Sequence, residues 1–240
     1  MLAVYIVDIE TAAAALEALE VHAPRLSDAE EARAASIPDG DRRRAWRACH
    51  IALRIVLERW AGEGIRRQPF RHGPHGRPSL PQPSPHFSLS HTEGLAVIAC
   101  ASAGEVGVDV ERRRDLALSP ERHAMIMAAA VGLRPTDERL HEEVGILQAW
   151  TRLEALGKAL GTGIGAVLSA ARDDASGRNP TGPDSSAVAR LLSTADIRVV
   201  DLALPPPYCG ALAAPRREVP PMIVPLPTDE AGLRAFAGRS

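Results

Sequence analysis

The sequence has 240 residues with 45% hydrophobic but only 3% aromatic residues, so aliphatic side chains and alanine must fill one large core or two small ones. The formal net charge of −2 argues against a general nucleic-acid binder. The N-terminus lacks the positive charge of a signal peptide and no apolar run approaches the ~18 residues of a membrane span, so we expect a soluble, cytoplasmic protein without a membrane partner.

Local patterns predict a mixture of helices and strands. In chain order, the predicted elements are a strand at 2–9, helices at 12–19, from Asp28 onward and from 41 to about 60, strands at 86–90, 95–101 and 105–111, helices at 120–133 and 140–160, and a hairpin pair of strands at 197–204 and 208–214. Ser27 and Asp41 are the expected N-caps of the second and third helices. Residues 68–86 and 170–186 are rich in Pro, Gly and polar residues and predict irregular chain, and the proline-rich tail after 215 is expected to be extended and loosely packed.

The order strand, helices, strands occurs twice. It predicts an α+β protein of two similar halves, 1–111 and 112–240, although no residue-level repeat accompanies it. Cys49, Cys100 and Cys209 are scattered without metal-ligand spacing, which favours a reducing compartment and a role as small buried hydrophobes.

Two carboxylates alternate in the predicted strand at 105–111. Its period of two places Gly107, Asp109 and Glu111 on one face, with the two carboxylate residues about 7 Å apart at their Cα atoms. Both could reach one Mg²⁺, which takes a few carboxylates and keeps other positions for waters and phosphates. The alternative is a solvated sheet face with the arginines at 112–114 as counter-ions.

The predicted helix around Trp150 adds a third carboxylate and a cation. It has an apolar stripe that would bury it against a sheet, made of Ile146, Trp150, Leu153 and Leu160. Glu154 and Lys158 lie one turn apart on the flank of that stripe. They are either an ordinary surface ion pair or a metal ligand beside a phosphate-neutralising lysine, and lysine is rare in this arginine-rich chain.

Four motifs in the same order resemble those of the 4′-phosphopantetheinyl transferases of the surfactin-synthetase-activating type. They are Gly76-Arg77-Pro78, Phe87-Ser-Leu-Ser-His91-Thr92, Gly107-Val-Asp109-Val-Glu111 and Trp150-Thr-Arg-Leu-Glu154-Ala-Leu-Gly-Lys158. The resemblance implies two similar α+β halves related by a pseudo-twofold axis, with the active site and coenzyme A in the cleft between them. It also implies transfer of the 4′-phosphopantetheine arm of coenzyme A to a serine of an acyl or peptidyl carrier protein, with release of adenosine 3′,5′-bisphosphate.

Roles for single residues also follow from the resemblance. Asp109, Glu111 and Glu154 would hold Mg²⁺, Lys158 would contact the pyrophosphate, and Glu154 or a metal-bound water would accept the serine proton. The residues expected around the adenosine and its 3′-phosphate are Arg44, Arg77, Ser90 and His91. The carrier protein is expected to be acidic and to meet the arginines at 42–47 and 112–114, and members of this size are typically monomers.

The chain departs from the family pattern at three positions. Leu153 stands where lysine is usual, which is expected to remove a cation beside the cleft, and Arg152 points about 100° away on a helix. Arg77 replaces a lysine with a different donor geometry. Gly157 costs roughly 1 kcal/mol of helix propensity, and the glycines at 161–165 are expected to loosen the next segment.

Because the three carboxylates are intact, we expect an active enzyme. The alternative is a catalytically weakened homologue that binds carrier protein or coenzyme A without efficient transfer. A nucleotide phosphotransferase is disfavoured because the phosphate-binding sequence GxxxxGK[ST] is absent. The sequence names no pathway, whether fatty acid, polyketide, nonribosomal peptide or lysine biosynthesis.

Overall fold

The computed structural model describes residues 1–82, 84–131, 133, 145–175, 187–218 and 220–238. Contacts divide the chain into two compact units: unit 1 comprises Met1–Gly73, Pro78–Ala103 and Pro221–Ser240, and unit 2 comprises Pro74–Arg77 and Gly104–Pro220. Residues 104–111 thus group with unit 2 and the C-terminal segment with unit 1, in contrast to the predicted halves of 1–111 and 112–240. The mixed α+β class is confirmed, and the similarity of the two halves stays a prediction.

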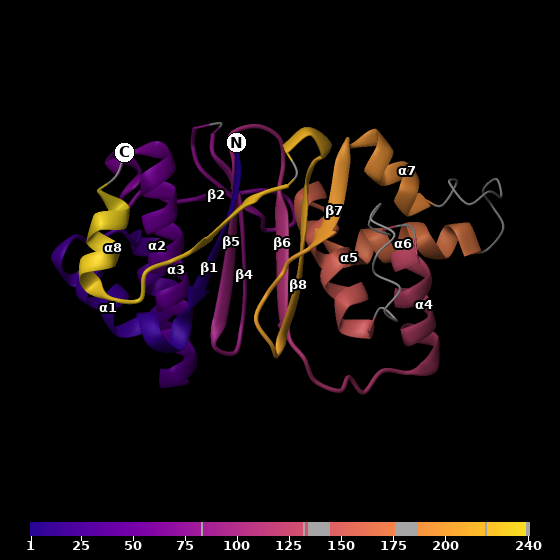
Figure 1. The fold of residues 1–240 in the computed structure, drawn as a ribbon, viewed down its shortest axis with the longest axis horizontal. Helices are drawn as coiled ribbons and strands as arrows, with labels where there is room; N and C mark the ends of the chain where they lie inside the picture. Colours follow the sequence, from indigo (N-terminus) through magenta and orange to yellow (C-terminus); the bar gives the residue numbers. More distant parts are fainter. Residues whose placement is uncertain (83, 132, 134–144, 176–186, 219, 239–240) are drawn as a thin grey trace. The chain divides into compact units, whose positions relative to one another are not determined.

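Unit 1 is built on a four-stranded sheet in the order β4-β5-β1-β9 (Figure 1). Its strands are β1 Leu2–Asp8, β4 His86–Thr92, β5 Leu95–Ala101 and β9 Met222–Pro225. β1 pairs antiparallel with β5 and parallel with β9. The helices are α1 Ile9–His22, α2 Asp28–Ala35, α3 Gly40–Ala61 and α8 Glu230–Ala237, with a 3₁₀ turn η1 at Glu63–Ile65 and a small ladder of β2 Arg71–His72 with β3 Pro78–Ser79.

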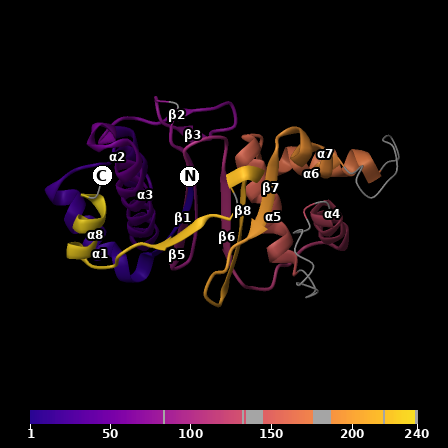
Figure 2. The ribbon, with the colours of Figure 1, turned by 45° about the horizontal axis from the view of Figure 1, so that its top comes forward.

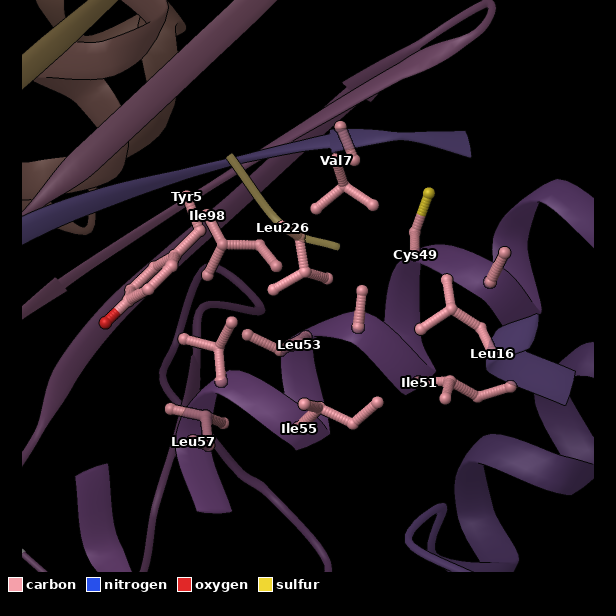
Figure 3. Packing of buried hydrophobic residues seen from close by; sticks show 14 of the residues in the cluster. Tyr5, Val7, Leu16, Cys49, Ile51, Leu53, Ile55, Leu57, Ile98 and Leu226 are labelled. Atoms are coloured by element: carbon pink, nitrogen blue, oxygen red, sulfur yellow. The ribbon is translucent and has the colours of Figure 1, made fainter. Parts of the chain in front are cut away.

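The core of unit 1 forms where α1 and α3 pack on one face of this sheet. Figure 3 shows Leu53 and Leu57 of α3 and Leu16 of α1 gathered with Ile98 of β5, all within one buried cluster. Eight residues between Ala48 and Leu57 of α3 are apolar and at most 1% exposed, so this helix is buried on nearly every side of its second half. Cys49 and Cys100 lie in this cluster and Cys209 is buried in unit 2, which confirms the expected role of the cysteines as small buried hydrophobes.

Helix starts follow capping chemistry in unit 1. Ser27 and Glu30 form the reciprocal capping box of α2, as expected. For α3 the expected cap was wrong: Asp39, with extended φ and ψ, accepts from the backbone N–H of Arg42 at 2.8 Å, and the helix begins at Gly40. Asp41 therefore lies inside the first turn, where it cannot act as the cap.

The proline-rich tail packs firmly, so the expectation of loose packing was wrong. The backbone N–H of Leu226, just after β9, donates to the carbonyl of Ile6 at 2.8 Å, and the Leu226 side chain lies in the core of unit 1 (Figure 3). α8 follows and contacts α1 and α3 (Figure 2). Its Leu233 is completely buried. Prolines are compatible with β9 because an edge strand uses its backbone donors on one side only.

An arginine is fully buried in unit 1. Arg54 donates from Nε to Glu30 Oε2 at 3.1 Å and from Nη2 to the carbonyl of Gln68 at 2.8 Å, and its guanidinium lies 3.9 Å from the ring centroid of Phe70. Burial alone would raise the pKa of Glu30, but hydrogen bonds from His50 and Arg54 lower it to about 2. The pair ties α2 to α3 and to the chain that follows η1.

Unit 2 has a three-stranded antiparallel sheet in the order β6-β8-β7. Its strands are β6 Gly107–Arg112, β7 Ile197–Asp201 and β8 Tyr208–Pro215, and its helices are α4 Pro120–Val131, α5 Ile146–Leu160, α6 Gly163–Ala175 and α7 Ala187–Thr194, with a 3₁₀ turn η2 at Arg216–Glu218. α5 contacts all three strands and packs beside α4 and α6 (Figure 1). The hairpin of β7 and β8 is confirmed.

Two expectations for unit 2 need correction. α6 occupies 163–175, where loosened chain and then a loop from 170 were expected. α5 begins at Ile146 after Gly145, and the earlier part of the predicted helix, 140–144, lies outside the described residues, as does 176–186 of the predicted loop. Among the described residues, no helix combines the length and the hydropathy that a bilayer crossing requires.

Candidate active site

β6 and α5 of unit 2 bring four of the predicted site residues together. As the alternation predicts, Asp109 and Glu111 lie on the face of β6 toward α5, which carries Glu154 and Lys158 one turn apart. A hydrogen bond joins α5 to β6 directly, in which Lys158 Nζ donates to Asp109 Oδ1 at 2.7 Å. Residues 49 positions apart in the chain thus share one site.

The close fit between β6 and α5 depends on Gly107. A Cβ atom at this position would lie 2.0 Å from the carbonyl oxygen of Ala155 and 2.5 Å from the backbone nitrogen of Ala159. The backbone of α5 therefore rests directly on the strand. This contact sets the depth at which Glu154 and Lys158 sit beside the carboxylates of β6.

Lys158 neutralises a buried carboxylate. The Asp109 side chain is 9% exposed, whereas the Lys158 side chain is 31% exposed, so the lysine reaches from the rim of the site inward. Its Nζ also donates to the carbonyl of Val108 at 3.0 Å. The ammonium is thereby held by two acceptors on β6, and a carboxylate that would be costly to bury alone has a charged partner.

The pKa of Glu154 depends on its burial and on the charges of Asp109, Glu111 and Lys158. Its carboxyl is half-buried, and burial raises its pKa, with further increases from the negative charges of Asp109 and Glu111 and an opposing effect from Lys158. The four groups therefore share one electrostatic environment. A carboxyl crowded by two other carboxylates is stabilised by a cation brought among them.

The donor chemistry of this site suits Mg²⁺, since all three candidate ligands are carboxylates. The side chains are nevertheless not arranged as a ready cage: within the described ranges, no group of three or more His, Cys, Asp or Glu residues could hold a metal ion. Glu111 instead pairs with Arg114 at 2.6 Å, and Asp109 pairs with Lys158. The residue types therefore fit Mg²⁺. To bind it, Asp109 and Glu111 would have to release Lys158 and Arg114.

Arg77 belongs to unit 2 and fastens the two elements of the site. Its Nη1 donates to the carbonyl of Ala159 at 2.9 Å, near the end of α5, and its Nη2 donates to the carbonyl of Val106 at 3.0 Å, just before β6. It also pairs with Glu105. The guanidinium expected at coenzyme A is thus engaged by protein acceptors, and its contact with the cofactor stays a prediction.

The other three residues expected at coenzyme A belong to unit 1. Arg44 is exposed on α3 and pairs with Asp41 at 3.0 Å. Ser90 is buried and His91 exposed on β4, as adjacent residues of a strand alternate between its faces. Their assignment to the adenosine and the 3′-phosphate stays a prediction.

Leu153 lies in the core of unit 2. Its side chain is 0% exposed and packs in the cluster formed by α4, α5, α6 and the sheet. In this chain the position contributes apolar packing to the core, and the loss of a cation that the resemblance implies stays a prediction.

One buried charge pair at α5 was not predicted from the sequence. Arg152, 4% exposed, donates from Nε and Nη2 to the two carboxylate oxygens of Asp201, the last residue of β7. That Arg152 points away from the position of Leu153 is confirmed. In the sequence, Asp201 stands out as an aspartate at the end of a β-branched strand. No local pattern connects it with Arg152, which lies 49 positions away.

One comparison with known proteins supports the resemblance. No protein-family model matches the chain. The chain is similar to a protein of Synechocystis sp. with the curated name "Putative 4′-phosphopantetheinyl transferase slr0495", being 30% identical to it over 127 residues, which is 49% of this chain and 50% of that protein. The match therefore spans about half the length of this relative. It supports a relationship to the 4′-phosphopantetheinyl transferase superfamily, without distinguishing the surfactin-synthetase-activating type within it.

Proposed function

We propose that this chain transfers the 4′-phosphopantetheine arm of coenzyme A to a serine of an acyl or peptidyl carrier protein and releases adenosine 3′,5′-bisphosphate. The observation that carries the proposal is the gathering of Asp109, Glu111, Glu154 and Lys158 at the contact of β6 with α5. These residues come from two separate motifs, and the similarity to the Synechocystis protein supports the same reaction class.

The carboxylates would hold Mg²⁺ on the pyrophosphate of coenzyme A. Asp109 and Glu111 come from β6, an edge strand of the unit 2 sheet that pairs with β8 and is covered by α5, and Glu154 approaches from α5. When bound there, the ion would neutralise charge that develops on the phosphate oxygens. To admit it, Asp109 would exchange its contact with Lys158, and Glu111 its contact with Arg114.

Lys158 would then bind the pyrophosphate. Its ammonium carries three donors on a flexible stem and already reaches the level of Asp109. A positive charge at this place would stabilise the leaving adenosine bisphosphate as the bond between its phosphate oxygen and the transferred phosphorus breaks.

The serine hydroxyl must lose its proton as its oxygen bonds to the transferred phosphorus. Glu154 is the candidate acceptor because burial and the negative charges of Asp109 and Glu111 raise the pKa of its half-buried carboxyl, which favours its taking up a proton. A water beside the carboxylates is the alternative acceptor.

The substrates would be recognised by further residues of the same motifs. We assign Arg44, Arg77, Ser90 and His91 to the adenosine and 3′-phosphate of coenzyme A, following their positions in the motifs. The exposed arginines at 112–114 suit an acidic carrier protein, since surface charges of this kind steer association.

A catalytically weakened homologue is the second candidate. It is favoured by the lack of a ready three-carboxylate cage in the described part of the chain. Such a protein would bind coenzyme A or carrier protein without efficient transfer.

Intact-mass spectrometry of an apo carrier protein tests the proposal. Incubated with this protein, coenzyme A and Mg²⁺, the carrier should gain the mass of one phosphopantetheine arm, and a chelator should abolish the gain. Asp109→Ala and Glu154→Ala should lose transfer, while Glu230→Ala, at an exposed pair on α8, should keep it. Undiminished transfer by Asp109→Ala or Glu154→Ala would refute the site, and coenzyme A binding without transfer to several carriers would favour the second candidate.

A further inference from the structure

α5 is fastened to the sheet of unit 2 by a second cation–carboxylate pair. Arg152 binds Asp201 through two parallel hydrogen bonds, Nε to Oδ1 at 2.7 Å and Nη2 to Oδ2 at 2.6 Å. The side chains of Arg152 and Asp201 are 4% and 24% exposed. Two parallel bonds fix the orientation of a guanidinium as well as its distance, which a single contact does not.

Gln148 strengthens this attachment one turn earlier on α5. Its Nε2 donates to Asp201 Oδ1 at 2.8 Å and to the carbonyl of Gly210 on β8 at 3.1 Å. Two successive turns of the helix thus bind the same carboxylate. Sliding or rotation of α5 along the sheet would break several of these bonds at once.

The sheet register places this pair opposite the candidate active site. Asp109 on β6 and Asp201 on β7 both pair with Ala211 of β8, so the two aspartates stand at the same level on the same face of the sheet. Ala211 between them is fully buried in the cluster that includes α5. The helix is therefore held at both flanks, by Lys158 on Asp109 and by Arg152 on Asp201.

We propose that Arg152, bound by Asp201 and Gln148, is a positioning residue that sets where Glu154 and Lys158 lie relative to Asp109. Groups that orient reacting residues commonly change activity by about 10- to 100-fold when they are removed. The catalytic part of this inference rests on the proposed function, whereas the geometric part does not. A pair that contributed stability alone would leave the Lys158–Asp109 contact unchanged in folded variants.

The geometry can be measured without any activity, because Lys158 is the only lysine in the sequence. Its labelling by an amine-reactive ester, followed by peptide mass spectrometry, reports how firmly Asp109 and Val108 hold its ammonium. Asp109→Asn is the positive control, since it weakens that pair directly. Arg234→Met, at the exposed ion pair of α8, is the matched control for loss of an arginine.

Arg152→Met and the double variant Arg152→Met/Asp201→Met separate position from stability. The single variant leaves a largely buried carboxylate without its cation, whereas the double variant removes both charges and should recover the thermal midpoint, as apolar replacement of a buried pair often does. Well below their midpoints, we expect both variants to label Lys158 several-fold faster than the wild type. If the folded double variant labelled Lys158 at the wild-type rate, the proposal would be overturned. The double variant also keeps the test decisive if the single variant does not fold.

Transfer kinetics provide the second readout. In the carrier-protein mass assay, we expect the double variant to lose about 10- to 100-fold in kcat with a smaller change in KM for coenzyme A. If the double variant kept the wild-type kcat while its Lys158 was labelled faster, the catalytic part of the proposal would be overturned. If the wild type transfers nothing, the proposed function fails, while the labelling rates still decide whether Arg152 positions α5.

Discussion

Gly107→Ala tests whether the close contact of β6 with α5 holds the candidate active site together. The new Cβ would lie 2.0 Å from the carbonyl oxygen of Ala155, and real Cβ atoms essentially never approach closer than 3.0 Å. The obstructing atoms belong to the backbone of α5, so no side chain can rotate aside. The helix would have to withdraw by about 1 Å or the strand bend by as much.

The expected loss has two parts. Overpacking of a close-packed interior costs typically ~1–3 kcal/mol of unfolding free energy. A displacement of about 1 Å at reacting groups can cost about 100-fold in rate, and Glu154 lies one residue before Ala155. Gly107→Ala should therefore lower the urea midpoint and reduce transfer by more than the unfolded fraction explains.

Gly165→Ala is the matched control. A Cβ there meets nothing within 4 Å, and alanine in α6 should leave stability unchanged or raise it by up to about 1 kcal/mol. Equal midpoints and equal transfer rates for Gly107→Ala and the wild type would refute the reasoning.

Three further predictions concern charge. Glu30 has a pKa lowered from 4.5 to about 2, so its contribution to stability is full above pH 4.5 and is lost as pH falls toward 2. Glu30→Gln should cost about 3–5 kcal/mol in urea unfolding at pH 7, because it leaves Arg54 buried without its partner, and it should flatten the acid dependence; an unchanged acid profile would contradict this. Leu153→Lys, which introduces the lysine that is usual in the family whose motifs the chain resembles, should destabilise unit 2 by about 3–5 kcal/mol because it places an unpaired charge at a fully buried position, and it should not increase transfer; a faster enzyme of normal thermal midpoint would contradict this. Charge reversal of the arginines at 112–114 should raise KM for the carrier protein more than KM for coenzyme A, and equal effects would count against that surface.

Local patterns were sufficient to predict the elements that carry the site. Alternation in β6 and helical periodicity around Trp150 depend on residues a few positions apart, so Asp109 and Glu154 were placed on the correct faces. Their approach followed from motif order rather than from periodicity. The ion pairs that hold the carboxylates, such as Lys158 with Asp109, required the packed structure.

Gly157 shows why the packing of α6 against α5 could not be predicted from the sequence. Gly157 reads as a weakness in a helix, yet a Cβ there would meet the backbone carbon of Gly163 at 2.6 Å. The glycine lets α6 turn back against α5, after Gly161 has ended α5 in the left-handed conformation. Helix propensity is a property of one position, whereas this contact depends on where the next helix goes.

The path of the chain through unit 1 has a consequence for its biogenesis. Leu226 and Leu233, which lie in the core, come from a segment translated after all of unit 2. While the ribosome still synthesises 104–220, β1 lacks the neighbour that β9 later provides, and an uncovered strand edge is a site for pairing with other chains. Nascent chains interrupted before residue 221 would therefore expose the β1 edge and the apolar surface that Leu226 covers. Protection of unit 1 from aggregation and proteolysis thus depends on synthesis of the segment that contains β9 and α8.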